Sequence, residues 1–279
     1  MLRSLFSGIS GLRANQTMLD VTGNNIANAN TVGFKASTTV FQDTLSQVMR
    51  GAGAAGAGNG GTNPIQVGLG VQVAATRGNF TQGSAQTTGA ATDLMIQGDG
   101  MFVLGSGNER VYSRAGAFTW DENGNLVSSS GKKVQGYAPG DAGGALVDVN
   151  LDSLAANLPA GVEMTSYSIG ADGVLRGTFS DDVQRDIGIV AIADFTNPAG
   201  LERVGETAFR ATANSGTPEL GVAGQGSRGD LMGGTLEMSN VDLSAEFTNL
   251  ILAQRGFQAS SRVITTSDQV LEELVNIKR

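Results

Sequence analysis

The stretch "LRSLFSGISGLRANQTMLDVTGNNIANANTVGFKAS", residues 2–37, sets the architecture, because an amphipathic run passes directly into a polar turn region. Its apolar seam advances by alternating steps of three and four residues, the spacing of helices that pack in coiled coils. The seam consists of Leu2, Leu5, Ile9, Leu12, Gln16, Leu19, Gly23 and Ile26. A helix over residues 3–28 would be about 39 Å long. Because Gln16 and Gly23 weaken the seam, we expect this helix to need a partner.

The carboxyl-terminal stretch has the same spacing and predicts a second helix over residues 242–277. Capping residues "SNVD" (239–242) precede it. Its seam consists of Leu243, Phe247, Leu250, Gln254, Phe257, Ser261, Ile264, Asp268, Leu271 and Val275. Further apolar residues off this seam make the stripe wider than one partner can cover: Ile251, Leu252, Val263, Val270, Leu274 and Ile277.

Two interpretations of these helices stay open. The first is an ordinary antiparallel helix pair within a globular domain. The second is a coiled coil of the two chain ends whose outer stripes pack against copies of the same chain. Polar residues on the seam favour the second interpretation somewhat, because they cost stability but specify register.

The polar run after the first helix predicts a hinge. Asparagine side chains can bond backbone groups that a helix end leaves free, and asparagine tolerates left-handed conformations. A glycine permits a turn there, and a phenylalanine can anchor the chain as it leaves the helix. The expected hinge residues are Asn24, Asn25, Asn28, Gly33 and Phe34.

The middle of the chain predicts a connector followed by β structure. Residues 31–67 include "GAGAAGAGNGGTN" (51–63), which is too rich in glycine to pack a core and indicates an extended connector. From residue 68 to 239, short alternating runs separated by turn signals such as "GDG" and "DENGN" predict an all-β domain. The predicted fold is therefore mainly β, with an α-helical coiled coil formed by residues 1–30 and 240–279, in elongated, discontinuous domains.

Composition excludes several function classes. The 279 residues include no Cys and no His, which removes disulfides, thiolate metal sites and every nucleophile paired with His. A formal net charge of −8 argues against nonspecific binding to nucleic acid. No apolar run is long enough for a membrane span, and the amino terminus lacks the pattern of a cleaved signal peptide. We expect a protein that is not an enzyme and holds no cofactor.

One turn invites a calcium interpretation. Asp121, Asn123 and Asn125 have the spacing of the first three ligands of an EF-hand loop. However, Leu126 stands where that loop needs Gly, and Lys132 stands where it needs a bidentate Glu. A plain hairpin turn is therefore the better prediction, and no metal site is expected.

The two ends of the chain resemble a known family. The opening stretch quoted above and the closing "LEMSNVDLSAEFTNLILAQRGFQASSRVITTSDQVLEELVNIKR" are similar to the ends of bacterial flagellar axial proteins of the rod and hook group. The likeness extends to "QVGLGVQV", "NFTQGSAQTTG", "ATDLMIQGDGMFVL" and "VYSRAGAFTWDENGNLV", and it is weakest over residues 138–165.

The resemblance implies an inner domain of paired terminal helices and a β-rich outer domain. It implies a helical homo-polymer that forms a hollow tube and passes motor torque toward the filament. The implied partners are further copies of the chain, the distal rod and hook–filament junction proteins, the hook cap and the flagellar (type III) export apparatus. The implied location is the extracellular flagellum, reached by export without a cleaved signal.

Within the group, the hook subunit is the first expectation and the distal rod subunit the alternative. Asp242 and Leu243, and the run Gly256, Phe257 and Gln258, favour the hook. The connector over residues 45–66 is longer than the shortest hook proteins carry, and the distal rod group has an insertion near this place. A more distant alternative is an acidic surface β protein that binds calcium or polysaccharide.

Overall fold

The computed structural model describes residues 2–54, 60–106, 109–141, 143–151, 164–181 and 183–277. Two compact units share the chain. Unit 1 comprises Met1–Ala27, Ser37–Gly78 and Asp242–Arg279, and unit 2 comprises Asn28–Ala36 and Asn79–Val241. The chain therefore passes between the units four times, after residues 27, 36, 78 and 241.

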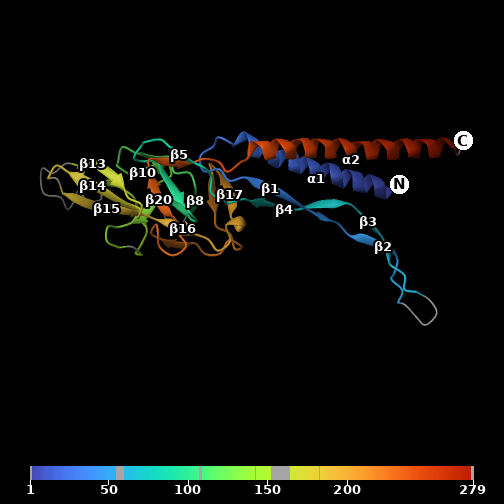
Figure 1. The fold of residues 1–279 in the computed structure, drawn as a ribbon, viewed down its shortest axis with the longest axis horizontal. Coiled ribbons are helices and arrows are strands. Elements are labelled where there is room, and N and C mark those ends of the chain that lie inside the picture. The colour runs from blue at the N-terminus through green and yellow to red at the C-terminus, as the bar shows by residue number, and fades with distance from the viewer. Residues whose placement is uncertain are drawn as a thin grey trace. The chain divides into compact units, whose positions relative to one another are not determined.

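Two long helices dominate unit 1 (Figure 1). Helix α1 spans Leu2–Ala27 and helix α2 spans Leu243–Ile277, and they lie side by side in antiparallel orientation. The Asp242 side chain caps α2, since its Oδ1 accepts the N–H groups of Ser244 at 2.9 Å and Ala245 at 3.2 Å. Both helices that the sequence predicts are present, within one residue of the expected bounds.

Small residues bring the two helices close together. A Cβ atom placed on Gly8 would lie 3.0 Å from Cγ1 of Ile264, and one placed on Gly11 would lie 2.8 Å from Oγ of Ser260. On α2, Ala253 is completely buried. The helices thus meet backbone to backbone more closely than a seam of large apolar side chains would allow.

Two antiparallel ribbons complete unit 1. Strand β1 (Ser37–Asp43) pairs with β4 (Val71–Gly78), and both lie against α1. Strand β2 (Ser46–Arg50) pairs with β3 (Ile65–Gly68), and an isolated bridge between Gly53 and Thr62 continues this ribbon. The stretch 31–67, for which the sequence indicates an extended connector, therefore contains paired strands. The centre of the Gly-rich run, residues 55–59, lies outside the described residues.

Unit 2 is built of antiparallel strands. One sheet has six strands in the order β17-β18-β8-β7-β16-β19, and another has five in the order β12-β11-β15-β14-β13; shorter pairs are β10-β9, β20-β6 and β21-β5. The short 3-10 helix η2 spans Pro198–Gly200. The strands are β5 (Ala85–Thr87), β6 (Leu94–Gln97), β7 (Met101–Ser106), β8 (Glu109–Ser113), β9 (Phe118–Trp120), β10 (Leu126–Ser128), β11 (Gln135–Tyr137), β12 (Val147–Asp148), β13 (Met164–Ile169), β14 (Val174–Phe179), β15 (Gln184–Val190), β16 (Ile192–Asp194), β17 (Glu202–Gly205), β18 (Ala208–Arg210), β19 (Glu219–Gly221), β20 (Asp230–Gly233) and β21 (Thr235–Glu237).

Strand β7 lies at the centre of the unit 2 core, with both faces buried. Phe102 and Leu104 point into one apolar cluster, where Phe102 meets Phe118 edge to face with ring centroids 5.1 Å apart. Met101 and Val103, on the opposite face, point into a second cluster. Successive side chains of a strand alternate between faces, which explains why the run "MFVL" is apolar at every position.

The turn "DENGN" joins β9 to β10. Oδ1 of Asp121 accepts the N–H groups of Asn123 at 3.0 Å and Asn125 at 2.7 Å, so this carboxylate closes the turn on its own backbone. The pKa of Asp121 is lowered, chiefly because the Asn125 side chain donates to the carboxylate. The hairpin that the sequence predicts here is therefore present.

Candidate functional site

The predicted contact residues of the helices divide into two sets. Leu5, Leu12, Leu19, Ile26, Leu250, Ile264 and Leu271 are partly buried, whereas Ile9, Leu243, Phe247, Phe257 and Val275 are exposed. The side chain of Leu2 lies outside the described residues. Because glycine and alanine form the closest helix contacts, several large apolar side chains of both helices are left facing away from the pair. Contact of these side chains with further copies of the chain stays a prediction.

Unit 1 exposes large apolar side chains along both of its helices. Phe247 is 52% exposed, and other exposed apolar residues lie on the same two helices: Phe6, Ile251, Leu252, Val263, Val270, Leu274 and Ile277. Within the described part of the chain, neither long helix is apolar enough to pass through a lipid bilayer. Apolar stripes of this size, rimmed by polar residues, mark surfaces that contact other proteins.

Among the predicted hinge residues, Asn25 ties three segments of unit 1 together. Its side chain is buried at the end of α1. Oδ1 accepts the N–H group of Ser37 at 3.0 Å, and Nδ2 donates to the Ser37 carbonyl at 2.7 Å. Nδ2 also donates to Oε1 of Glu246 on α2 at 2.9 Å. Asn25 therefore fixes the start of β1 and the first turn of α2 to the end of α1.

The other predicted hinge asparagines are placed differently. Asn24 is exposed on α1 in unit 1. Asn28 begins unit 2, where its Oδ1 accepts the hydroxyl of Thr31 at 3.1 Å and its carbonyl accepts the N–H group of Thr31 at the same distance. Asn28 thus organises a local turn, as short polar side chains do after helices.

Gly33 and Phe34 are fixed within unit 2. Gly33 has a φ angle of 67°, a left-handed conformation that glycine adopts without strain, and its N–H group donates to the carbonyl of Glu237 at 2.8 Å. Phe34 is buried, with the guanidinium of Arg203 5.0 Å from its ring centroid. The turn expected at Gly33 is present, whereas a hinge motion stays a prediction.

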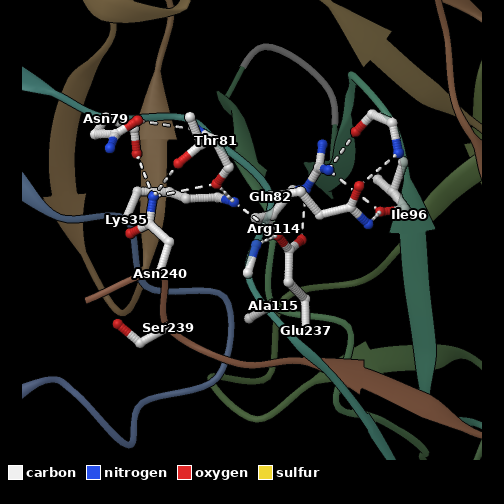
Figure 2. Close-up of polar contacts among 12 residues, drawn as sticks. Lys35, Asn79, Thr81, Gln82, Ile96, Arg114, Ala115, Glu237, Ser239 and Asn240 are labelled. Atoms are coloured by element: carbon white, nitrogen blue, oxygen red, sulfur yellow. Dashed lines mark hydrogen bonds and ion pairs between the residues drawn. The ribbon is translucent and has the colours of Figure 1, made fainter. Parts of the chain in front are cut away.

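A buried ionic cluster, which the sequence does not reveal, lies beside this turn (Figure 2). Glu237 is completely buried at the end of β21. Its Oε1 accepts Lys35 Nζ at 2.7 Å and the N–H group of Gly83 at 2.8 Å, and its Oε2 accepts Arg114 Nε at 2.7 Å. Arg114 also donates to the carbonyls of Gly98 and Gly100.

Within this cluster, the negative charge of Glu237 and the positive charges of Lys35 and Arg114 stabilise one another. Burial acts to raise the pKa of Glu237, but the Arg114 charge and the Lys35 hydrogen bond outweigh it, and the pKa is lowered below its ordinary value of 4.5. Burial lowers the pKa of Lys35, although Glu237 opposes that change. All three side chains therefore depend on one another, since any of them left alone would be a buried unpaired charge.

Asn240 joins further segments of unit 2 beside the cluster (Figure 2). Its Oδ1 accepts the N–H group of Ala36 at 2.8 Å, and its Nδ2 donates to the carbonyls of Asn79 at 2.9 Å and Thr81 at 3.1 Å. The N–H group of Asn79 in turn donates to the Ala36 carbonyl at 2.8 Å. Ala36, Asn79 and Asn240 each lie within two residues of a point where the chain crosses between the two units. Asn240 therefore fixes the unit 2 side of these crossings, as Asn25 fixes the unit 1 side near Ala27 and Ser37.

Comparison with known proteins assigns the family. Three family models match the chain: "Flagella basal body rod protein" over residues 5–35, "Flagellar hook protein FlgE/F/G D1 domain" over 95–177, and "Flagellar basal body rod FlgEFG protein C-terminal" over 232–277. The first and last models cover most of both helices, and the middle model covers strands of unit 2.

Curated relatives match over the full length. The chain is 44% identical to the flagellar basal-body rod protein FlgG of Bacillus subtilis (strain 168) and 35% identical to FlgG of Borreliella burgdorferi, with 100% of both chains covered in each case. It is 30% identical to the flagellar hook protein FlgE of B. burgdorferi, again with 100% of both chains covered. The chain therefore belongs to the flagellar FlgE/F/G family, the structural proteins of the rod and hook.

Proposed function

We propose that the chain is the subunit of the distal flagellar rod, in which copies of it polymerise helically into a hollow shaft that transmits torque to the hook. The observation that carries this proposal is the match in length with the rod proteins. Alignments with the two FlgG relatives run to 280 and 285 positions, whereas alignments with two hook proteins run to 441 and 463 positions. The hook proteins therefore have long segments for which this 279-residue chain has no counterpart.

The residues that favour a hook subunit carry less weight than this full-length match. These residues include the run Gly256, Phe257 and Gln258. Gly256 has a local structural reason, since a Cβ atom there would lie 2.5 Å from Oδ1 of Asn15 on α1. A glycine at this contact follows from helix packing and does not separate hook from rod. The expectation of a hook subunit is therefore replaced by the distal rod alternative.

Two surfaces of unit 1 support a polymer. The apolar stripes of α1 and α2 face outward, and burial of each large apolar side chain would contribute about 1.5–3 kcal/mol. The ribbon of β2 and β3 has exposed side chains along both strands, including Met49 at 64% exposure. A two-stranded ribbon alone is marginally stable in water, so neighbouring copies would stabilise it. Export through the flagellar apparatus to the growing tip is part of the same proposal.

Electron microscopy of cells that lack the chain tests the proposal. We expect basal bodies with a rod truncated on its distal side and no hook, restored to full length when the wild-type chain is supplied. A chain truncated before Leu243 provides the matched control, because it keeps unit 2 but lacks α2, and it should not restore the rod. A complete rod that lacks only the hook would overturn the distal rod assignment in favour of the hook.

A further inference from the structure

The two helices of unit 1 end at different places. Oγ of Ser4 lies 3.2 Å from Oγ of Ser267, and Asn25 bonds to Glu246, so the antiparallel register places Leu2 beside Gln269. Helix α2 continues to Ile277. Its last two turns, residues 270–277, have no α1 residue beside them and extend past the amino-terminal end of α1 (Figure 1). We call residues 270–277 the α2 overhang.

The α2 overhang is amphipathic. Val270, Leu274 and Ile277 follow the i, i+4, i+7 spacing of one helix face, and Ile277 is 80% exposed. Glu273 lies beside this stripe on the helix surface and gives it an acidic border, whereas Glu272 lies on the opposite face of the helix. Helix ends with an exposed apolar stripe gain stability when another surface covers the stripe.

A groove whose lining includes apolar side chains and one arginine lies on another part of unit 1. It has a volume of about 400 Å³ and lies between α1 and β4, and we call it the α1–β4 groove. Its apolar lining includes Phe6, Ile9 and Val73, and Phe6 is 67% exposed. Arg13 lines the groove and forms no ion pair with any residue that the structure describes.

We propose that the α2 overhang of one copy docks in the α1–β4 groove of the next copy, with Glu273 facing Arg13. The groove follows α1 from Phe6 to Thr17, about 18 Å, and the overhang is about 12 Å long. The apolar stripe fits the apolar lining, and the acidic border complements the unpaired arginine, as when an amphipathic helix lies in a groove.

The contact joins two copies and not two parts of one copy. The overhang points away past the amino-terminal end of α1, whereas the groove begins at Phe6 and runs in the opposite direction. Two different patches that meet head to tail generate an open helical filament when the rotation does not close a ring. This inference rests on the proposed function and names the contact along the polymer.

Cysteine crosslinking tests the contact, since the chain has no cysteine of its own. Ile9→Cys and Leu274→Cys chains are expressed together in cells that lack the wild-type chain, and basal bodies are isolated and oxidised. We expect a disulfide-linked dimer of the two variants. The matched control pairs Ile9→Cys with Val263→Cys, which is exposed on α2 but lies outside the overhang, and this pair should stay monomeric.

A charge exchange provides a second readout. Arg13→Glu alone, or Glu273→Arg alone, should each lower the amount of chain in isolated basal bodies by about tenfold, because like charges then meet. The two substitutions together should restore assembly. Restoration would not occur if each change only disturbed the folding of its own helix.

The outcomes separate this inference from the proposed function. Basal bodies that contain the chain in the rod, but give neither the specific crosslink nor the restoration, would overturn the docking contact and leave the rod assignment intact. Basal bodies that never contain the chain would overturn both.

Discussion

Asn25 at the end of α1 holds the backbone of Ser37 from both sides, since its Oδ1 accepts the Ser37 N–H group and its Nδ2 donates to the Ser37 carbonyl. Of the residues between them, 28–36 belong to unit 2. The Asn25 side chain therefore links the end of α1, after which the chain enters unit 2, to Ser37, at which the chain returns to unit 1. Asn25 thus forms a buried clamp at the position where the sequence predicts a hinge, and a hinge motion of the neighbouring residues stays a prediction.

We predict that Asn25→Ala destabilises unit 1 by about 1–3 kcal/mol, because the Ser37 backbone groups and the buried Glu246 carboxylate lose their partner. Asn25→Asp should be no better, since it lacks the Nδ2 donor and places a second carboxylate beside Glu246. Urea unfolding followed by far-UV circular dichroism of the helices measures the effect. Gln16→Ala, at an exposed position of the same helix, is the control, and equal stability of the Asn25 and Gln16 variants would contradict the clamp.

A second prediction concerns the close approach of the helices. Gly8→Leu should destabilise the helix pair by about 1–3 kcal/mol, because its side chain would overlap Ile264. Gly23→Ala is the matched control, since no atom beyond the adjacent backbone of α1 and its two chain neighbours lies within 4 Å of a Cβ placed there. That change should stabilise α1 by about 0.5–1 kcal/mol through helix propensity. Thermal unfolding by circular dichroism distinguishes them, and a Gly8→Leu chain as stable as wild type would disprove the packing argument.

The existence of both helices could be predicted from sequence, but their closest contacts could not. A heptad spacing over many residues is a strong local signal. By helix propensity alone, Gly8, Gly11 and Gly256 would weaken a helix, although these residues form the contact between α1 and α2. Their role depends on which residues of the other helix lie opposite, and sequence spacing alone does not give that register.

The buried ionic cluster also could not be predicted from the sequence, because its residues lie far apart in the chain. Lys35 and Glu237 are 202 positions apart in the chain, and no local pattern links them. The available signal is weak: Glu237 ends a short strand in which Thr235 and Leu236 are also buried, so a charged side chain occupies a core position. The coarse fold, mostly β with a helix at each end, follows from periodicity and turn residues, whereas long-range pairing does not.

We predict that Glu237→Ala costs about 3–5 kcal/mol of stability, because Lys35 and Arg114 are then buried without a counter-charge. Glu202→Gln is the matched control, since the Glu202–Arg210 pair is exposed at 3.0 Å and should contribute less than about 1 kcal/mol. The fluorescence of Trp120, the only tryptophan of the chain and a residue of unit 2, reports unfolding directly. Similar losses of stability in both variants would show that the buried cluster contributes no more to folding than an exposed ion pair does.

Glu237 should also make the stability of unit 2 sensitive to acid. Its folded pKa lies below the ordinary value of 4.5, which the unfolded chain approximates, so the unfolded state takes up the proton first as the pH falls. The stabilisation is therefore fully present above about pH 5 and is lost as the pH falls below 4.5 through the folded pKa. Glu237→Gln cannot titrate at this position, so the advantage of wild type over this variant should shrink as the pH falls from about 7 to about 3. Urea unfolding midpoints from Trp120 fluorescence at several pH values measure this difference, and a constant difference across the range would show that the Glu237 carboxylate is not responsible.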